Sequence, residues 1–103
     1  MSRKEEILRK LESAIPFIQK EYGVQSMRLF GSTARGEDDD ESDVDIFVEM
    51  PPKAFKFFSL TDYLRTLLER EVDVVRNHAR LNDYFRQEIY KDGIRIGSSI
   101  WRG

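Results

Sequence analysis

The 103-residue sequence predicts a single small α+β domain, in which a mixed β-sheet is flanked by helices. Segments with apolar residues at helical spacing alternate along the chain with short runs rich in β-branched and aromatic residues. The length fits one domain, and no Pro-, Gly- or Ser-rich linker divides the chain. We therefore expect residues 1–103 to fold as one domain.

The first helix is expected to occupy the N-terminal fifth of the chain. Its start is marked by Ser2-Arg3-Lys4-Glu5, which has the form of a capping box, and apolar residues then recur at helical spacing as far as Tyr22. Pro16 interrupts this pattern, so we expect a kink or a restart after Ser13. Gly23 suits the left-handed residue that ends a helix.

The remainder is expected to alternate between strands and helices. Pro51-Pro52 should stop the second strand, and Ser59 and Asp62 suit the cap and first turn of the next helix. The expected segments are strands at 24–30, 43–50 and 71–76, a glycine-bounded turn at 31–36, an exposed acidic loop at 37–42, a helix through residue 68, a helix at 81–91 and a short edge strand at 94–96.

Composition narrows the classes of protein to consider. The chain has no cysteine, no apolar run long enough for a membrane span and no signal peptide, so we expect a cytoplasmic protein without membrane contact. The net charge is −2, and residues 37–49 contain eight acidic residues and no basic one. This charge does not favour direct binding to nucleic acid.

Two aspartates, Asp43 and Asp45, interrupt an otherwise hydrophobic strand, although Asp is depleted in strands. Alternate residues of a strand share a face, so the two carboxylates should project together, about 7 Å apart along the backbone. Val44, Ile46 and Val48 should point into the core. Neighbouring carboxylates repel unless a cation or proton lies between them, and Mg²⁺ favours a few carboxylates plus substrate phosphates.

A third aspartate, Asp73, stands within the "VDVV" of the third expected strand. If that strand pairs beside the second, the three carboxylates converge at one edge and can hold two metal ions. That arrangement serves in-line displacement at phosphorus. Gly31 and Ser32 directly follow the first strand, where backbone N–H groups and a hydroxyl can bind phosphate oxygens.

Each feature has a simpler interpretation when it is taken alone. A Gly-Ser turn is usually a plain loop, an Asp-x-Asp is usually a solvated strand end, and Asp73 could instead pair with Arg28 or Arg76. The combined spacing arises by chance in about one chain of this length in a thousand. An EF-hand loop is excluded, because no Gly stands at its sixth position. The combination favours a site for Mg²⁺ and phosphate.

This pattern resembles the nucleotidyltransferase superfamily that includes DNA polymerase beta. The resemblance rests on Gly31-Ser32, ten residues, then Asp43-x-Asp45, with Arg35-Gly36 between them and Asp73 on a later strand. More narrowly, the chain resembles the minimal nucleotidyltransferases, the MNT-type antitoxins encoded beside HEPN-domain toxins. The similarity runs from "EYGVQSMRLFGSTARG" to "YFRQEIYKDGIRI", and every signature position is filled.

The resemblance implies a role for each of these residues. Asp43 and Asp45 would bind the Mg²⁺ that carries the triphosphate of ATP, and Asp73 would complete a second metal site and help to activate the attacking hydroxyl. Ser32 and the amide beside Gly31 would hold the β- and γ-phosphates. Two roles are open for Arg35, which would either neutralise the same phosphates or brace the acidic loop.

The resemblance also implies an activity and a partner. The chain would be an Mg²⁺-dependent antitoxin that transfers AMP from ATP to a tyrosine hydroxyl of a cognate HEPN ribonuclease toxin, in a hetero-oligomer. The sequence lacks the acceptor-binding domain of larger superfamily members, which favours a protein acceptor over nucleic acid. Two alternatives stay open: a non-catalytic antitoxin that masks the toxin by binding, and a transferase with a small-molecule acceptor.

Two further segments have a possible link to a partner. The acidic loop, Glu37 to Glu41, is expected to be either a solubilising surface loop or a docking site for a basic patch on the toxin. Trp101 is expected to be exposed or packed on a partner.

Overall fold

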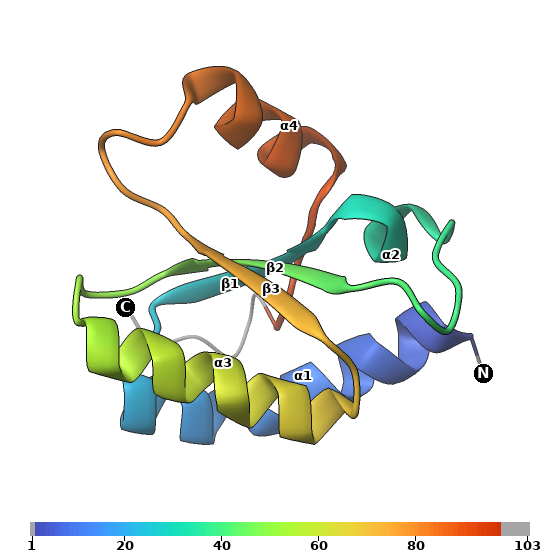
Figure 1. Ribbon diagram of the computed structural model, residues 1–103, viewed down its shortest axis with the longest axis horizontal. Helices are drawn as coiled ribbons and strands as arrows, with labels where there is room; N and C mark the ends of the chain where they lie inside the picture. The colour runs from blue at the N-terminus through green and yellow to red at the C-terminus, as the bar shows by residue number, and fades with distance from the viewer. Residues whose placement is uncertain (1, 98–103) are drawn as a thin grey trace.

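The computed structural model describes residues 2–97 and contains a four-stranded sheet with the strand order β3-β2-β1-β4. The two longer helices, α1 and α3, cover one face of the sheet, and the shorter α2 and α4 lie on the other (Figure 1). The elements are α1 Arg3–Tyr22, β1 Ser26–Phe30, α2 Gly31–Arg35, β2 Val44–Glu49, α3 Ala54–Leu68, β3 Val72–Arg76, α4 Asp83–Asp92 and β4 Ile94–Arg95.

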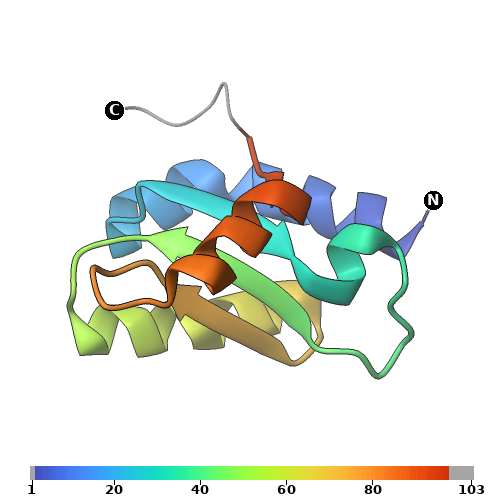
Figure 2. The same ribbon diagram turned by 90° about the horizontal axis from the view of Figure 1, so that it is seen from above.

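The sheet is mixed, as the sequence predicts. β1 pairs in antiparallel fashion with both β2 and β4, whereas β2 and β3 run parallel. The end of β1 and the starts of β2 and β3 therefore meet at one end of the sheet, and α2 lies beside that end (Figure 2).

The core lies between the sheet and the layer formed by α1 and α3. Val44, Ile46 and Val48 are fully buried there, as expected for alternate residues of β2. The opposite face of the sheet is covered by aromatic contacts. Phe47 meets Tyr90 of α4 edge-to-face at 5.9 Å between ring centroids, and the Arg28 guanidinium lies 4.5 Å from the centroid of the Tyr90 ring.

The expected ends of α1 are confirmed. Of the two alternatives expected after Ser13, the restart is wrong and the kink stays a prediction. The Ser2 hydroxyl accepts a hydrogen bond from the Glu5 amide at 3.1 Å, and Gly23 ends the helix with φ +71°. The helix continues through Pro16, which is exposed. Buried residues precede and follow the proline, so packing of this apolar face outweighs the loss of one backbone hydrogen bond.

Two other expectations require correction. The segment predicted as a turn, 31–36, contains the five-residue helix α2, with positive φ angles at Gly31 and Gly36. The third helix begins at Ala54 instead of near Ser59, because Phe57 already packs against the core. Other element bounds differ from expectation by two residues or fewer.

The short C-terminal strand is confirmed as an edge strand. Ile94 and Arg95 form β4, and the Ile96 amide extends the pairing by donating to the Met27 carbonyl oxygen at 2.9 Å. Trp101 lies outside the described residues. Across residues 2–97, none of the helices has both the length and the apolar character that crossing a membrane requires.

Candidate active site

The first two predicted carboxylates stand at the start of β2, on the face that carries α2 and α4. Asp43 immediately precedes the strand and is exposed, whereas Asp45 within it is half-buried. Val44 and Ile46 are completely buried on the α1–α3 side. The alternation of the strand therefore directs the two aspartates away from the core, as predicted.

The third predicted carboxylate lies on the neighbouring strand. β3 pairs beside β2 in parallel, and Asp73 is the register partner of Asp45. Paired residues of adjacent strands are separated by about 5 Å. Asp73 is exposed between the buried Val72 and Val74, so it also faces away from the core. The condition set by the sequence, that the third strand should pair beside the second, is confirmed.

The charges of these residues act on one another. Burial raises the pKa of Asp45 above its ordinary value, and the nearby charges of Asp73 and then Asp43 raise this pKa further. The positive charge of Arg35 acts in the opposite direction and lowers the pKa. A pKa raised by burial and by like charges indicates that ionised Asp45 is disfavoured until a cation approaches.

Gly31 is fitted closely against one of these carboxylates. Its φ angle is +74°, in the region that side chains rarely adopt, and a Cβ atom at this position would collide with Asp45 Oδ2. The start of α2 therefore contacts Asp45 directly. Ser32, the next residue, is half-buried in the same first turn. The two halves of the Gly-Ser and Asp-x-Asp pattern thus come together in space.

Arg35 lies at the other end of α2. Its Nε atom pairs with Glu37 Oε1 at 2.9 Å, and both side chains are about half exposed. This contact fits the predicted bracing of the acidic loop, and the effect of Arg35 on Asp45 shows that its charge also reaches the carboxylates. A contact with phosphate stays a prediction.

The carboxylates do not form a ready-made cage for a metal ion. Among residues 2–97, no group of three or more Asp, Glu, His or Cys side chains is arranged to hold one. Mg²⁺ is usually bound by one or two carboxylates, with water and substrate phosphates completing its shell. The oxygen donors of Asp43, Asp45 and Asp73, and the repulsion acting on Asp45, fit such a partial site.

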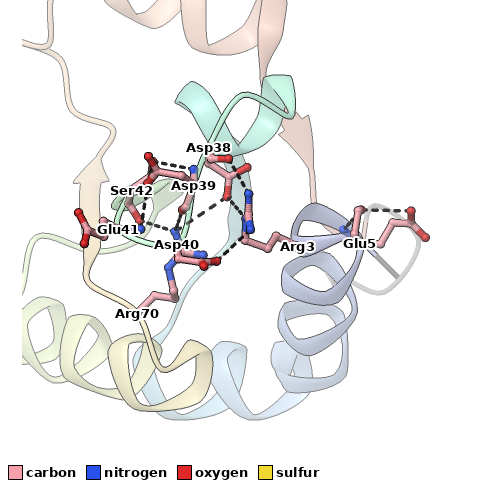
Figure 3. A network of polar contacts seen from close by, with 9 residues as sticks. Arg3, Glu5, Asp38, Asp39, Asp40, Glu41, Ser42 and Arg70 are labelled. Atoms are coloured by element: carbon pink, nitrogen blue, oxygen red, sulfur yellow. Dashed lines mark hydrogen bonds and ion pairs between the residues drawn. The ribbon is translucent and has the colours of Figure 1, made fainter.

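The acidic loop is exposed as predicted at Glu37, Asp39, Asp40 and Glu41, but not at Asp38. The Asp38 side chain is only 4% exposed and lies between two arginines, Arg3 of α1 and Arg70 before β3 (Figure 3). Neither arginine was among the predicted site residues. They stand 35 and 32 positions away from Asp38 in the sequence, and no local pattern links them to it.

Three comparisons with known proteins agree with this geometry. Residues 12–99 match the family described as "Polymerase beta, Nucleotidyltransferase". A protein of Methanocaldococcus jannaschii, whose name provisionally assigns it as a protein adenylyltransferase, is 40% identical over 98 residues. The match covers 93% of this chain and 97% of the relative.

Solved structures show the same fold. One is a chain provisionally named a minimal nucleotidyltransferase, with a TM-score of 0.74, 29% identity, and coverage of 91% of this chain and 95% of that one. Another contains a tri-AMPylated Shewanella oneidensis HEPN toxin in complex with an MNT antitoxin. It aligns with a TM-score of 0.61 and 20% identity, covering 86% and 71% of the two chains. With the carboxylates and Gly31 placed as described, this chain belongs to the polymerase beta nucleotidyltransferase family.

Proposed function

We propose that this chain is an Mg²⁺-dependent protein adenylyltransferase, which transfers AMP from ATP to a tyrosine hydroxyl of a HEPN-domain toxin and thereby neutralises it. The observation that carries the proposal is the pairing of Asp45 with Asp73 across β2 and β3, with Asp43 and Gly31 beside Asp45. This places three carboxylates next to the turn that would receive the phosphates.

The reaction exchanges one bond at phosphorus for another. The acceptor oxygen forms a bond to the α-phosphorus of ATP, the bond from that phosphorus to the β-bridging oxygen breaks, and pyrophosphate leaves. Bound Mg²⁺ would neutralise negative charge on the phosphates and the leaving group. Asp43 and Asp45 would hold the first Mg²⁺, and Asp73 would complete a second metal site and accept the proton that the attacking hydroxyl loses. A tyrosine hydroxyl, with a pKa near 10, needs this help to lose its proton.

The residues of α2 would hold the rest of the triphosphate. Ser32 can donate its hydroxyl hydrogen to a phosphate oxygen, and the absence of a side chain at Gly31 leaves the adjacent backbone open beside Asp45. Arg35, whose guanidinium lies near enough to Asp45 to lower its pKa, would neutralise phosphate charge after exchanging its contact with Glu37.

The acceptor is proposed from the relatives. The M. jannaschii relative carries the name of a protein adenylyltransferase, which supports a protein substrate over a small molecule. The Shewanella complex pairs an AMPylated HEPN toxin with an antitoxin of the same fold, which supports a HEPN partner. We extend both features to this chain as part of the proposal.

Mass spectrometry of the intact partner tests the proposal. This protein is mixed with Mg²⁺, ATP and the product of the adjacent gene, and we expect the partner to gain mass in steps of one AMP. Asp43→Asn with Asp45→Asn should abolish the gain. A matched control replaces Glu12 and Glu21, both exposed on α1, with Gln; it changes the net charge equally and should preserve transfer.

Two other outcomes would contradict the proposal. Tight binding without any gain in mass would favour an antitoxin that only masks the toxin. A gain in mass that persists in the double Asn variant would mean that catalysis does not depend on the carboxylates of β2.

A further inference from the structure

Arg70, which lies between α3 and β3, holds the acidic loop that leads into β2. The Nη2 atom of Arg70 donates hydrogen bonds to the carbonyl oxygens of Asp39, at 2.9 Å, and Ser42. Ser42 directly precedes Asp43, and Arg70 stands three residues before Asp73. One guanidinium therefore connects the segments that lead to two of the three carboxylates (Figure 3).

A second arginine fixes the outer part of the same loop. Arg3, in the first turn of α1, donates to the Asp38 carbonyl oxygen at 2.8 Å and to the Asp38 carboxylate at 3.3 Å. It also pairs with Asp40 at 2.9 Å. The Asp38 carboxylate lies 3.9 Å from Arg70 Nη2, so both arginines offset the charge of this nearly buried group.

The loop is also closed by its own hydrogen bonds. The Asp39 carboxylate accepts from the Glu41 amide at 2.9 Å and from the Ser42 hydroxyl at 3.1 Å, and these bonds lower the pKa of Asp39. Immediately beyond the loop, the Val44 amide donates to the Glu71 carbonyl oxygen at 2.9 Å. The loop and the start of β3 thus form one hydrogen-bonded unit.

We propose that Arg70 is a positioning residue of the active site: it holds the start of β2 against the start of β3, and so sets Asp43 and Asp73 relative to one another. This inference rests on the proposed function. Arginine suits the role because its Nη2 atom carries two hydrogens, one for each carbonyl oxygen, and this atom lies 3.9 Å from the Asp38 carboxylate. Lysine would keep the charge but not this fixed geometry.

Metal binding gives a direct test, with Mn²⁺ as the probe. Its affinity is measured by titration for the wild-type chain and for Arg70→Gln and Arg70→Lys, without ATP or partner. We expect both variants to bind Mn²⁺ about 10 to 100 times more weakly, the usual effect of disturbing groups that orient metal ligands. The folded fraction of each variant is measured by circular dichroism without metal, so that weaker binding is distinguished from a loss of folded protein.

Arg65→Gln is the matched control. Arg65 lies in α3, five residues before Arg70, and its ion pairs are with Asp62 and Glu71 and not with the loop. Its loss should leave the Mn²⁺ affinity within about twofold of wild type. If Arg70→Gln does not fold, Arg70→Lys, which keeps the charge and the aliphatic stem, carries the comparison.

Two results would overturn the inference, and they differ in what they say about the proposed function. Arg70 variants that bind Mn²⁺ as tightly as Arg65→Gln would refute the positioning role and leave the proposed transferase intact. A wild-type chain whose Mn²⁺ affinity does not depend on Asp43 and Asp45 would refute the metal site itself, and the positioning role with it.

Discussion

Replacing Gly31 with alanine offers a sharp test of how the site is built, because a second glycine of the same helix provides the control. Gly31, the first residue of α2, and Gly36, which caps its C-terminus, have almost equal φ angles of +74° and +73°. A Cβ atom at Gly36 meets no atom within 4 Å, whereas one at Gly31 collides with the Asp45 carboxylate. Both substitutions place an alanine in the left-handed region of the backbone, but only Gly31→Ala also brings a Cβ atom into collision with Asp45.

The shared cost can be estimated from the backbone alone. Placing an L-residue in the left-handed region costs about 1–2 kcal/mol. For a domain of this size, each 1 kcal/mol lowers the Tm by about 4–8 °C. We therefore expect Gly36→Ala to melt roughly 4–16 °C below wild type and to retain its transfer rate per folded molecule. Thermal unfolding followed by circular dichroism measures the first quantity.

Gly31→Ala should lower the rate of AMP transfer as well as the stability of the fold. Its Cβ atom forces the Asp45 carboxylate away from the position it shares with Asp73 in the register of β2 and β3. A displacement of about 1 Å at reacting groups can cost about a hundredfold in rate. We expect transfer to the partner protein to fall by about that factor below Gly36→Ala, at equal concentrations of folded protein. Equal rates for the two variants would show that catalysis does not require Asp45 where the structure places it.

Three further predictions concern charge. The raised pKa of Asp45 means that stability is lost as the pH rises through that pKa. In EDTA, Asp45→Asn should therefore be more stable than wild type at pH 7, and the gain should be smaller at pH 4. Urea unfolding that shows a loss of stability at pH 7 would contradict this. Arg35→Gln should raise the KM for ATP about tenfold, whereas Glu37→Gln, which frees Arg35 from its ion pair, should lower the KM. Equal steady-state KM values for the two variants would show that Arg35 only braces the loop. If the acidic loop docks the partner, Asp40→Asn with Glu41→Gln should weaken binding to the partner and make the affinity less dependent on salt. Titrations from about 50 to about 500 mM salt, the range over which screening acts, measure this dependence. Unchanged affinity at low salt would exclude docking by these two exposed acids.

The sequence was sufficient to place the carboxylates because strand alternation is a local property. Once Val44 and Ile46 are assigned to the core, Asp45 must face the other side, and the same reasoning applies to Asp73 between Val72 and Val74. The sequence gives the pairing of β2 with β3 only as a condition. It depends on the crossover through α3, which no short stretch of sequence specifies.

The parts that sequence reasoning missed depend on contacts between distant residues. Asp38 lies in a run of acids and was assigned to solvent with its neighbours, since nothing next to it distinguishes it from Asp40. Its burial depends on Arg3 and Arg70, which approach only after α1 and β3 have packed around the loop. Sequence reasoning misses the helix α2 because four residues between two glycines also satisfy the pattern of a turn.

The distribution of charge explains how the fold holds three carboxylates that repel one another close together. Asp38 is stabilised by two arginines, so the loop can fold tightly without a metal ion. Asp45 has no ion-pair partner among the described contacts, and burial and two carboxylates act against its charge. A cation bound there would relieve this repulsion only in the folded state, so it should stabilise the fold by about 2.7 kcal/mol at a hundred times its Kd. In the proposed site, the residues that repel one another when the site is empty would thus favour metal binding, and the loop would hold them in position.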